Sequence, residues 1–130
     1  MMHRRHFAAS SIFAGLFLAF PAFAAEKVEY TPSNFDAAQK AGKSILVEIH
    51  APWCPTCKAQ APILSDLEAD PKFKDLVVVH VDFDSQKDAV QRFGARMQST
   101  LITFKGGKET GRSVGDTKRS SLAELLNKAI

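Results

Sequence analysis

Cys54 and Cys57 are the two cysteines of this 130-residue chain, and only Pro55 and Thr56 separate them. A disulfide between such close neighbours closes a very small loop, so on the chain-entropy model it stabilises a fold far less than a bridge between distant segments. The spacing therefore favours a dithiol that opens and closes during a reaction over a structural bridge. We predict thiol–disulfide exchange at this pair.

The order of the two thiols follows from the helix expected after them. The nucleophile is a thiolate, whereas a free cysteine with a pKa of about 8.5 is mostly thiol at neutral pH. Pro55 suits the first position of a helix, because that position needs no N–H donor. Cys54 would then cap the helix, where unpaired N–H groups and the helix dipole stabilise an anion. We assign Cys54 as the nucleophile and Cys57 as the resolving thiol.

Two other interpretations of the pair stay open. The thiols could be half of a zinc site completed by His50 or His80, although a lone Cys-x-x-Cys pair is a weak zinc signal and the chain has no second pair. They could also be reduced cysteines without chemistry, which the spacing disfavours.

The segments next to the pair predict the elements that position it. Residues 44–50 and 76–82 are near-continuous apolar runs, typical of strands covered on both faces. Glu48 interrupts the first run with an acid. Residues 58–69 predict a helix whose apolar side carries Ala61, Leu64 and Leu67 and whose polar side carries Lys58, Asp66 and Glu68.

The other predicted elements give the fold class. They are a strand at 28–30, a helix at 35–41, a helix at 85–93 capped by Ser85, strands at 100–104 and 109–114, and a helix at 117–130. Strands that alternate with helices are typical of an α/β domain with parallel strands in its sheet.

The first 24 residues predict a secretory signal. Arg4 and Arg5 form a basic start, residues 7–20 are apolar, and residues 22–24 read Ala-Phe-Ala, a typical cleavage site. We therefore expect domain 1–24 to be a signal peptide and 25–130 to be the folded domain, with no stable membrane insertion after cleavage. The folded domain has 15 Lys and Arg against 14 Asp and Glu. These charges are interspersed, so no nucleic-acid partner is expected.

Several landmarks together resemble the thioredoxin family. They are Trp53-Cys54-Pro55-Thr56-Cys57-Lys58 after an apolar strand, Pro62 in the next helix, Phe93-Gly94-Ala95-Arg96, and Phe104-Lys105-Gly106-Gly107-Lys108. The resemblance implies the thioredoxin fold, a mixed central sheet flanked by helices. The Trp-Cys-Pro-Thr-Cys motif is also similar to that of periplasmic thioredoxin-like proteins that reduce apocytochrome c.

The same resemblance implies roles for residues outside the pair. Glu48 matches a buried acid that takes the proton of Cys57, and His80 stands where many thioredoxins have a lysine that could tune this acid. Trp53, Pro55, Ser99 and Thr100 match positions that face a substrate polypeptide.

Ser99 departs from the family pattern, which has a cis-proline before Thr100. A cis bond before a non-proline residue costs about 2.5–4 kcal/mol, so the Gln98–Ser99 bond is expected to be trans. A hydroxyl would then lie opposite Cys54, where it could bond a thiolate. In the family this proline also keeps metals off the dithiol.

The expected function is an exported thiol–disulfide oxidoreductase that reduces or isomerises disulfides of other exported proteins. It would need no cofactor beyond its own Cys54–Cys57 disulfide, and a membrane thiol carrier would supply electrons. The alternative is a binding module of the same fold that holds a metal, a cluster or a client through the two cysteines.

Overall fold

The computed structural model describes residue 15 and residues 24–130. The predicted signal segment 1–24 lies almost wholly outside the described residues, so it stays a prediction. No helix of the described part is long and apolar enough to cross a membrane.

Strands and helices alternate along the described chain. They are β1 (Glu26–Glu29), α1 (Pro32–Lys40), β2 (Ser44–His50), α2 (Pro55–Glu68), the 3-10 turn η1 (Pro71–Phe73), β3 (Val77–Asp82), α3 (Lys87–Arg92), β4 (Thr100–Lys105), β5 (Lys108–Val114) and α4 (Arg119–Asn127).

The strands of the described residues form one mixed sheet in the order β1-β3-β2-β4-β5. β1 and β2 both run parallel to β3, whereas β4 runs antiparallel to β2 and to β5. The predicted α/β fold with a mixed central sheet is confirmed. β2 is the central strand, as its apolar run predicted.

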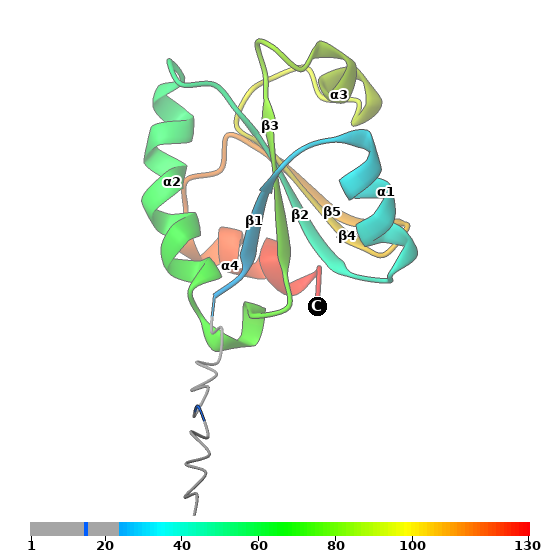
Figure 1. Ribbon diagram of the computed structural model, residues 1–130. Coiled ribbons are helices and arrows are strands. Elements are labelled where there is room, and N and C mark those ends of the chain that lie inside the picture. The colour runs from blue at the N-terminus through cyan, green and yellow to red at the C-terminus, as the bar shows by residue number, and fades with distance from the viewer. Residues whose placement is uncertain (1–14, 16–23) are drawn as a thin grey trace, which may run out of the picture.

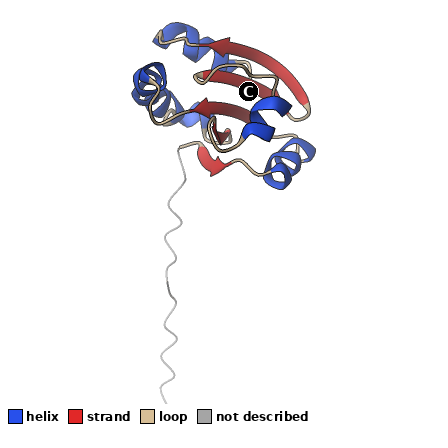
Figure 2. Ribbon diagram, turned by 90° about the horizontal axis from the view of Figure 1, so that it is seen from above, coloured by secondary structure: helices blue, strands red, loops and turns tan. Residues whose placement is uncertain are grey.

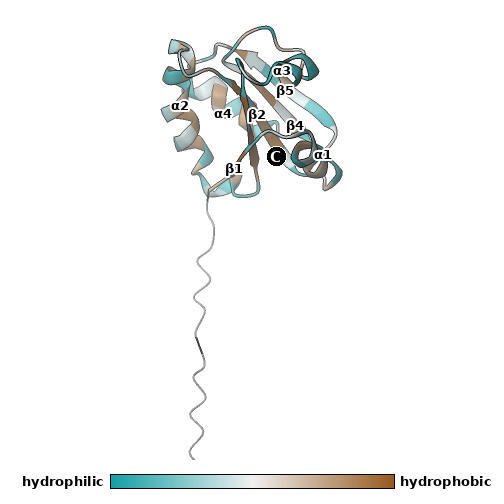
Figure 3. Ribbon diagram, turned by 45° about the horizontal axis from the view of Figure 1, so that its top comes forward, coloured by the Kyte–Doolittle hydropathy of each residue, from teal (hydrophilic) through white to brown (hydrophobic). Residues whose placement is uncertain are grey.

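Helices cover both faces of the sheet. In Figure 1, α2 lies on one side of the strands and α1 and α3 lie on the other, and Figure 2 shows the strands as a layer between helices. One face packs Ile45, Val47 and Ile49 of β2 with Phe35 and Phe93. The opposite face packs Leu46 of β2 with Leu64 of α2 and Leu122 of α4. Hydrophobic residues accordingly concentrate along the central strands in Figure 3.

Two of the helix starts that differ from the prediction have a clear local cause. α1 begins at Pro32 instead of Phe35, because Thr31 and Asn34 form a reciprocal capping box at its start. α3 begins at Lys87 after Gln86, so the predicted Ser85 cap is wrong. The hydroxyl and the backbone N–H of Ser85 both donate to Asp82 Oδ1, which holds Ser85 in a turn before the helix.

Candidate active site

The Cys-x-x-Cys segment lies at the N-terminal end of α2, directly after the central strand. Cys54 has extended backbone angles and is the N-cap of α2, and Pro55 opens the helix. The N–H of Cys57 donates to Cys54 Sγ at 3.1 Å. Both cysteines are free thiols, so the structure shows the reduced form of the pair. An N–H aimed at this sulfur from a helix N-terminus can stabilise negative charge that develops on the sulfur during exchange.

Both thiols are covered by their neighbours. Cys54 is 0% exposed and Cys57 is 3% exposed. They form a small cluster with Ala51, and the ring of Phe83 packs against this cluster. A large disulfide substrate therefore reaches Cys54 only after the cover over this sulfur moves.

Cys57 resists ionisation in this position. Burial raises the pKa of the Cys57 thiol to about 11, and the nearby Cys54 contributes in the same direction. Hydrogen bonds with the backbone of Ala51 and of Ser99 act in the opposite direction. A group that must attack as a thiolate and holds its proton this firmly requires a base.

Glu48 lies behind Cys57 on the central strand. A cavity of about 30 Å³, lined by Glu48, Cys57, His50 and Gln60 among others, lies between the two groups and has room for a water. Glu48 also lines an outer cavity of about 220 Å³ together with Lys27 and His80. Its Oε1 atom is buried without a hydrogen-bond partner among the described residues.

The surroundings of Glu48 favour its protonated form. Burial raises the pKa of Glu48 well above 4.5, and the neighbouring carboxyl of Glu68 raises it further. The charge of Lys27 acts in the opposite direction. A carboxyl group with a raised pKa is suited to proton transfer near neutral pH.

The two histidines lie beside this acid. His80 is paired with Glu48 across β2 and β3, and its Nδ1 lies 3.1 Å from Glu29 Oε2. The ring centroid of His50 lies 5.2 Å from that of His80. Burial, followed by the nearby His80, lowers the pKa of His50, whereas Asp82 raises it. His80 therefore lies next to Glu48 in the sheet, and its role in tuning this acid stays a prediction.

Trp53 and Pro55 lie on the solvent side of the dithiol. The Trp53 side chain is 55% exposed, and its indole N–H donates to Asp84 Oδ2 at 2.7 Å. Pro55 is also exposed. Met97, in the loop before β4, is 52% exposed. These positions fit the predicted contact surface for a polypeptide, because a tethered indole offers a flat apolar face.

Ser99 and Thr100 are buried on the other side of the dithiol. The described chain has no cis peptide bond, so the Gln98–Ser99 bond is trans, as predicted. Ser99 has a φ of 61°, the left-handed region that disfavours side chains. Its N–H donates to the Ile49 carbonyl at 2.8 Å, and its hydroxyl donates to the Gln98 carbonyl. Thr100 donates to the Met97 carbonyl at 2.7 Å.

The expected bond from the Ser99 hydroxyl to a thiol is not formed among the described residues. The hydroxyl is occupied by a carbonyl of its own loop, because the left-handed backbone at Ser99 brings the two groups together.

Two polar residues of the site were missed by the sequence prediction. Gln60 is buried and donates to the Asp116 carbonyl at 2.8 Å, with a longer contact of 3.4 Å to the Ser99 carbonyl. Glu68 was placed on the polar side of its helix, which is wrong, because it is 3% exposed. Its spacing of four residues from Leu64 puts both on one helix face, and this signal was available. Ala61, predicted to face the core, is exposed.

The structure does not bring together a set of metal ligands. No group of three or more His, Cys, Asp and Glu side chains within residue 15 and residues 24–130 is close enough to hold an ion. His50 and His80 therefore do not complete the zinc site with the two cysteines that the alternative interpretation required.

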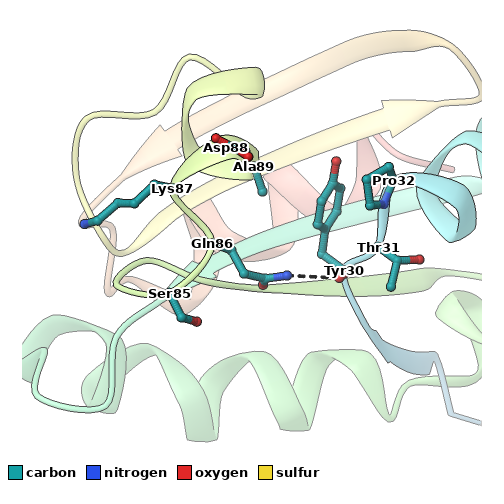
Figure 4. Close-up of a pocket in the computed structure, with 8 residues that line it drawn as sticks. All are labelled: Tyr30, Thr31, Pro32, Ser85, Gln86, Lys87, Asp88 and Ala89. Carbon is teal, nitrogen blue, oxygen red and sulfur yellow. Dashed lines mark hydrogen bonds between the residues drawn. The ribbon is translucent and has the colours of Figure 1, made fainter.

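A larger cavity lies away from the thiols. It measures about 430 Å³ and is lined by residues 30–32 and 85–89, with Gln86 donating to the Tyr30 carbonyl at 3.0 Å (Figure 4). It holds no cysteine or histidine, so it offers no group for exchange chemistry.

A dithiol at a helix N-terminus, beyond the end of the central strand of a mixed sheet, defines a thiol–disulfide oxidoreductase. The Thioredoxin family model matches residues 26–128, so the chain belongs to the thioredoxin family. It is 34% identical to the thioredoxin of Bacillus subtilis (strain 168), over 78% of this chain and 95% of that protein.

Other relatives agree with this assignment. The chain is 37% identical to the thioredoxin of Chlamydia muridarum (strain MoPn / Nigg), over 65% of this chain and 80% of that protein. The crystal structure of Trxlp from Edwardsiella tarda EIB202 has a TM-score of 0.76 and 42% identity, and the match covers 78% of this chain and 98% of that chain.

Proposed function

We propose that this enzyme is exported and that it reduces or isomerises disulfides of other exported proteins through Cys54 and Cys57. The observation that supports this most is the position of Cys54 at the N-cap of α2, with the Cys57 N–H 3.1 Å from its sulfur. Export rests on the predicted signal segment 1–24.

The reaction transfers two electrons from the dithiol to the client. The Cys54 thiolate attacks one sulfur of the client disulfide, so that a mixed disulfide forms and the first client thiolate leaves. Cys57 then loses its proton and attacks Cys54 Sγ. This second step forms the Cys54–Cys57 disulfide, breaks the mixed disulfide and releases the second client thiolate.

Glu48 accepts the proton of Cys57 in the second step. The two residues line the same small cavity, so one bridging water is enough to connect them. The pKa of Cys57 is raised to about 11, which makes unassisted deprotonation slow at neutral pH. His80, next to Glu48 in the sheet, tunes this acid.

The client binds across the exposed side of the dithiol. Trp53 and Pro55 supply the outer contact surface, and Ser99 and Thr100 supply the loop on the opposite side of the thiols. The hydroxyl and the N–H of Ser99 already donate to the Gln98 and Ile49 carbonyls, and its own carbonyl accepts from the Gly115 N–H. The loop therefore contacts a client through its surface rather than through a free polar group of Ser99.

The partners follow from the direction of electron flow. A reductant outside the cytoplasm is oxidised in every cycle, so a membrane thiol carrier must reduce Cys54–Cys57 again. The clients are exported proteins with cysteines. The Trp-Cys-Pro-Thr-Cys motif suggests apocytochrome c, with its paired cysteines, as one client to test.

A stopped-flow and trapping experiment tests the exchange chemistry. The reduced protein is mixed with a model disulfide such as 5,5′-dithiobis(2-nitrobenzoate), and the released thiolate is recorded. The wild type should release two equivalents, Cys57→Ser should release one and retain a mixed disulfide on Cys54, and Cys54→Ser should lose the fast phase. Equal release by the wild type and by Cys54→Ser would reject the assignment.

Two further measurements test direction and location. A reduction potential of the Cys54/Cys57 couple below that of client disulfides supports electron donation, and a potential well above them reverses the direction. Expression of the full chain followed by fractionation and mass spectrometry should give a mature protein that begins at Ala25 outside the cytoplasm. Retention of residues 1–24 in a cytoplasmic protein would refute export.

A further inference from the structure

A second buried glutamate adjoins the acid behind Cys57. Glu68 is in the last turn of α2 and is 3% exposed, although glutamate is rarely buried without a partner. Its carboxyl group lies beside that of Glu48: Lys27 contacts Glu68 and lines the same cavity as Glu48, and Glu68 acts on the ionisation of Glu48. Two carboxylates at this distance repel each other in a buried site, so both cannot carry a full charge without strong compensation.

One cation partly compensates the pair. Lys27 of β1 places its Nζ 3.0 Å from Glu68 Oε2, and its side chain is 53% exposed while that of Glu68 is 4% exposed. A single ammonium at the solvent edge balances one negative charge. Two acids and one such cation leave room for one proton on the acid pair.

Unpaired carboxyl oxygens among the described residues also indicate one proton on the acid pair. Glu48 Oε1 and both carboxyl oxygens of Glu68 are buried and have no hydrogen-bond partner there, apart from the ion pair of Glu68 Oε2 with Lys27. Carboxylate oxygens only accept, so two facing carboxylates leave these atoms unsatisfied, whereas one proton between them supplies a donor. One proton shared between the two carboxyl groups removes the cost of leaving such buried oxygens unsatisfied.

We propose that Glu68 is a positioning residue for proton transfer: it shares one proton with Glu48, and Lys27 sets the balance of charge on the pair. The proposal rests on the proposed role of Glu48 as the base for Cys57. Glu68 determines the pH at which Glu48 is free to accept that proton, and it does not itself touch the thiols.

Among the described residues, the other titratable groups that line the two cavities beside Glu48 are Glu29 on β1, His50 on β2, His80 on β3 and Cys57 on α2. The residues of α4 in the same core, Leu122, Leu125 and Leu126, are uncharged. Glu68 and Lys27 act on the ionisation of Glu48 in opposite directions. Removing one charge or the other should therefore have opposite effects.

The test measures the pH dependence of the resolving step. In the stopped-flow reaction with excess 5,5′-dithiobis(2-nitrobenzoate), the second thiolate release is independent of reagent concentration and reports the attack of Cys57. Glu68→Gln should shift the pH midpoint of this step downward, because it removes a charge that disfavours ionisation of Glu48. Lys27→Met should shift the midpoint upward, because it removes a charge that favours ionisation.

Asp66→Asn is the matched control. Asp66 is on the same helix two residues from Glu68, carries the same charge and is exposed, where it pairs with Arg119. This substitution should leave the midpoint unchanged. A structural role for Glu68 alone would lower the stability of Glu68→Gln without moving the midpoint, and that result would overturn the proposal.

A second readout does not depend on catalysis. In reduced protein labelled with ¹³C at glutamate carboxyl groups, the Glu48 and Glu68 signals should titrate together in two steps. In Glu68→Gln, Glu48 should show a single step at lower pH. Independent single titrations in the wild type would refute the shared proton even in an active enzyme. Coupled titrations with an unchanged rate profile would instead reject Glu48 as the base.

Discussion

At position 99 a glycine variant should be more stable than an alanine variant, which is the reverse of the usual order. At ordinary positions glycine is about 0.5–1 kcal/mol less stable than alanine, because it loses more freedom on folding. Ser99 is the one non-glycine residue with positive φ in the described chain, at 61°. A side chain in this region costs about 1–2 kcal/mol, which glycine avoids. Ser99→Gly should therefore be more stable than Ser99→Ala by about 0.5–1 kcal/mol.

A proline at the same position should be strongly destabilising. The Ser99 N–H donates to the Ile49 carbonyl at 2.8 Å, and proline has no N–H. That bond contributes about 0.5–1.5 kcal/mol. Proline also fixes φ at about −65°, far from the observed value, so a total loss of about 3 kcal/mol or more is expected unless the loop refolds.

Urea unfolding of the reduced variants measures these differences. Ser120, exposed within α4, provides the control position, because glycine there should be about 1 kcal/mol less stable than alanine. Equal unfolding slopes are needed for the comparison. If Ser99→Gly is less stable than Ser99→Ala, as at Ser120, then the left-handed backbone at Ser99 is not a feature of the folded protein.

Three further changes have defined outcomes. The pKa of Glu48 is raised from 4.5, so the folded state keeps a proton that the unfolded state loses, and its stability falls as the pH rises above 4.5 towards the raised pKa. Glu48→Gln should remove this fall, so the variant should gain stability over the wild type as the pH rises in pH-resolved urea unfolding; parallel wild-type and variant curves would contradict it. Phe83→Ala should speed alkylation of Cys54 by iodoacetamide, because the ring packs on the thiol cluster, and an unchanged rate would show that other groups cover the sulfur. Gly111→Ala should cost about 1–3 kcal/mol in thermal unfolding, since its Cβ would lie 2.8 Å from Leu125 Cδ1, and wild-type stability would mean that α4 shifts freely.

Much of the fold could be predicted from local patterns. The apolar run with Glu48 in it became the central strand, and Gly94 ends α3 with a φ of 62°, as expected for a helix stop. Ser85 shows the limit of such rules. Its side chain had a nearer partner in Asp82 than the helix it was expected to cap.

The sequence by itself determined the reaction, because Cys54, Pro55 and Cys57 form their helix N-terminus from local geometry alone. Only the tertiary structure decided which charged groups surround Glu48, the proposed acceptor of the Cys57 proton. Glu68 and Lys27 come from elements far apart in the chain, and packing of α2 and β1 against the sheet brings them to Glu48. The left-handed backbone at Ser99 was also decided there, since hydrogen bonds with Ile49 of β2 and with Gly115 after β5 hold the loop. Local propensity has no information on which distant charges will share a buried site.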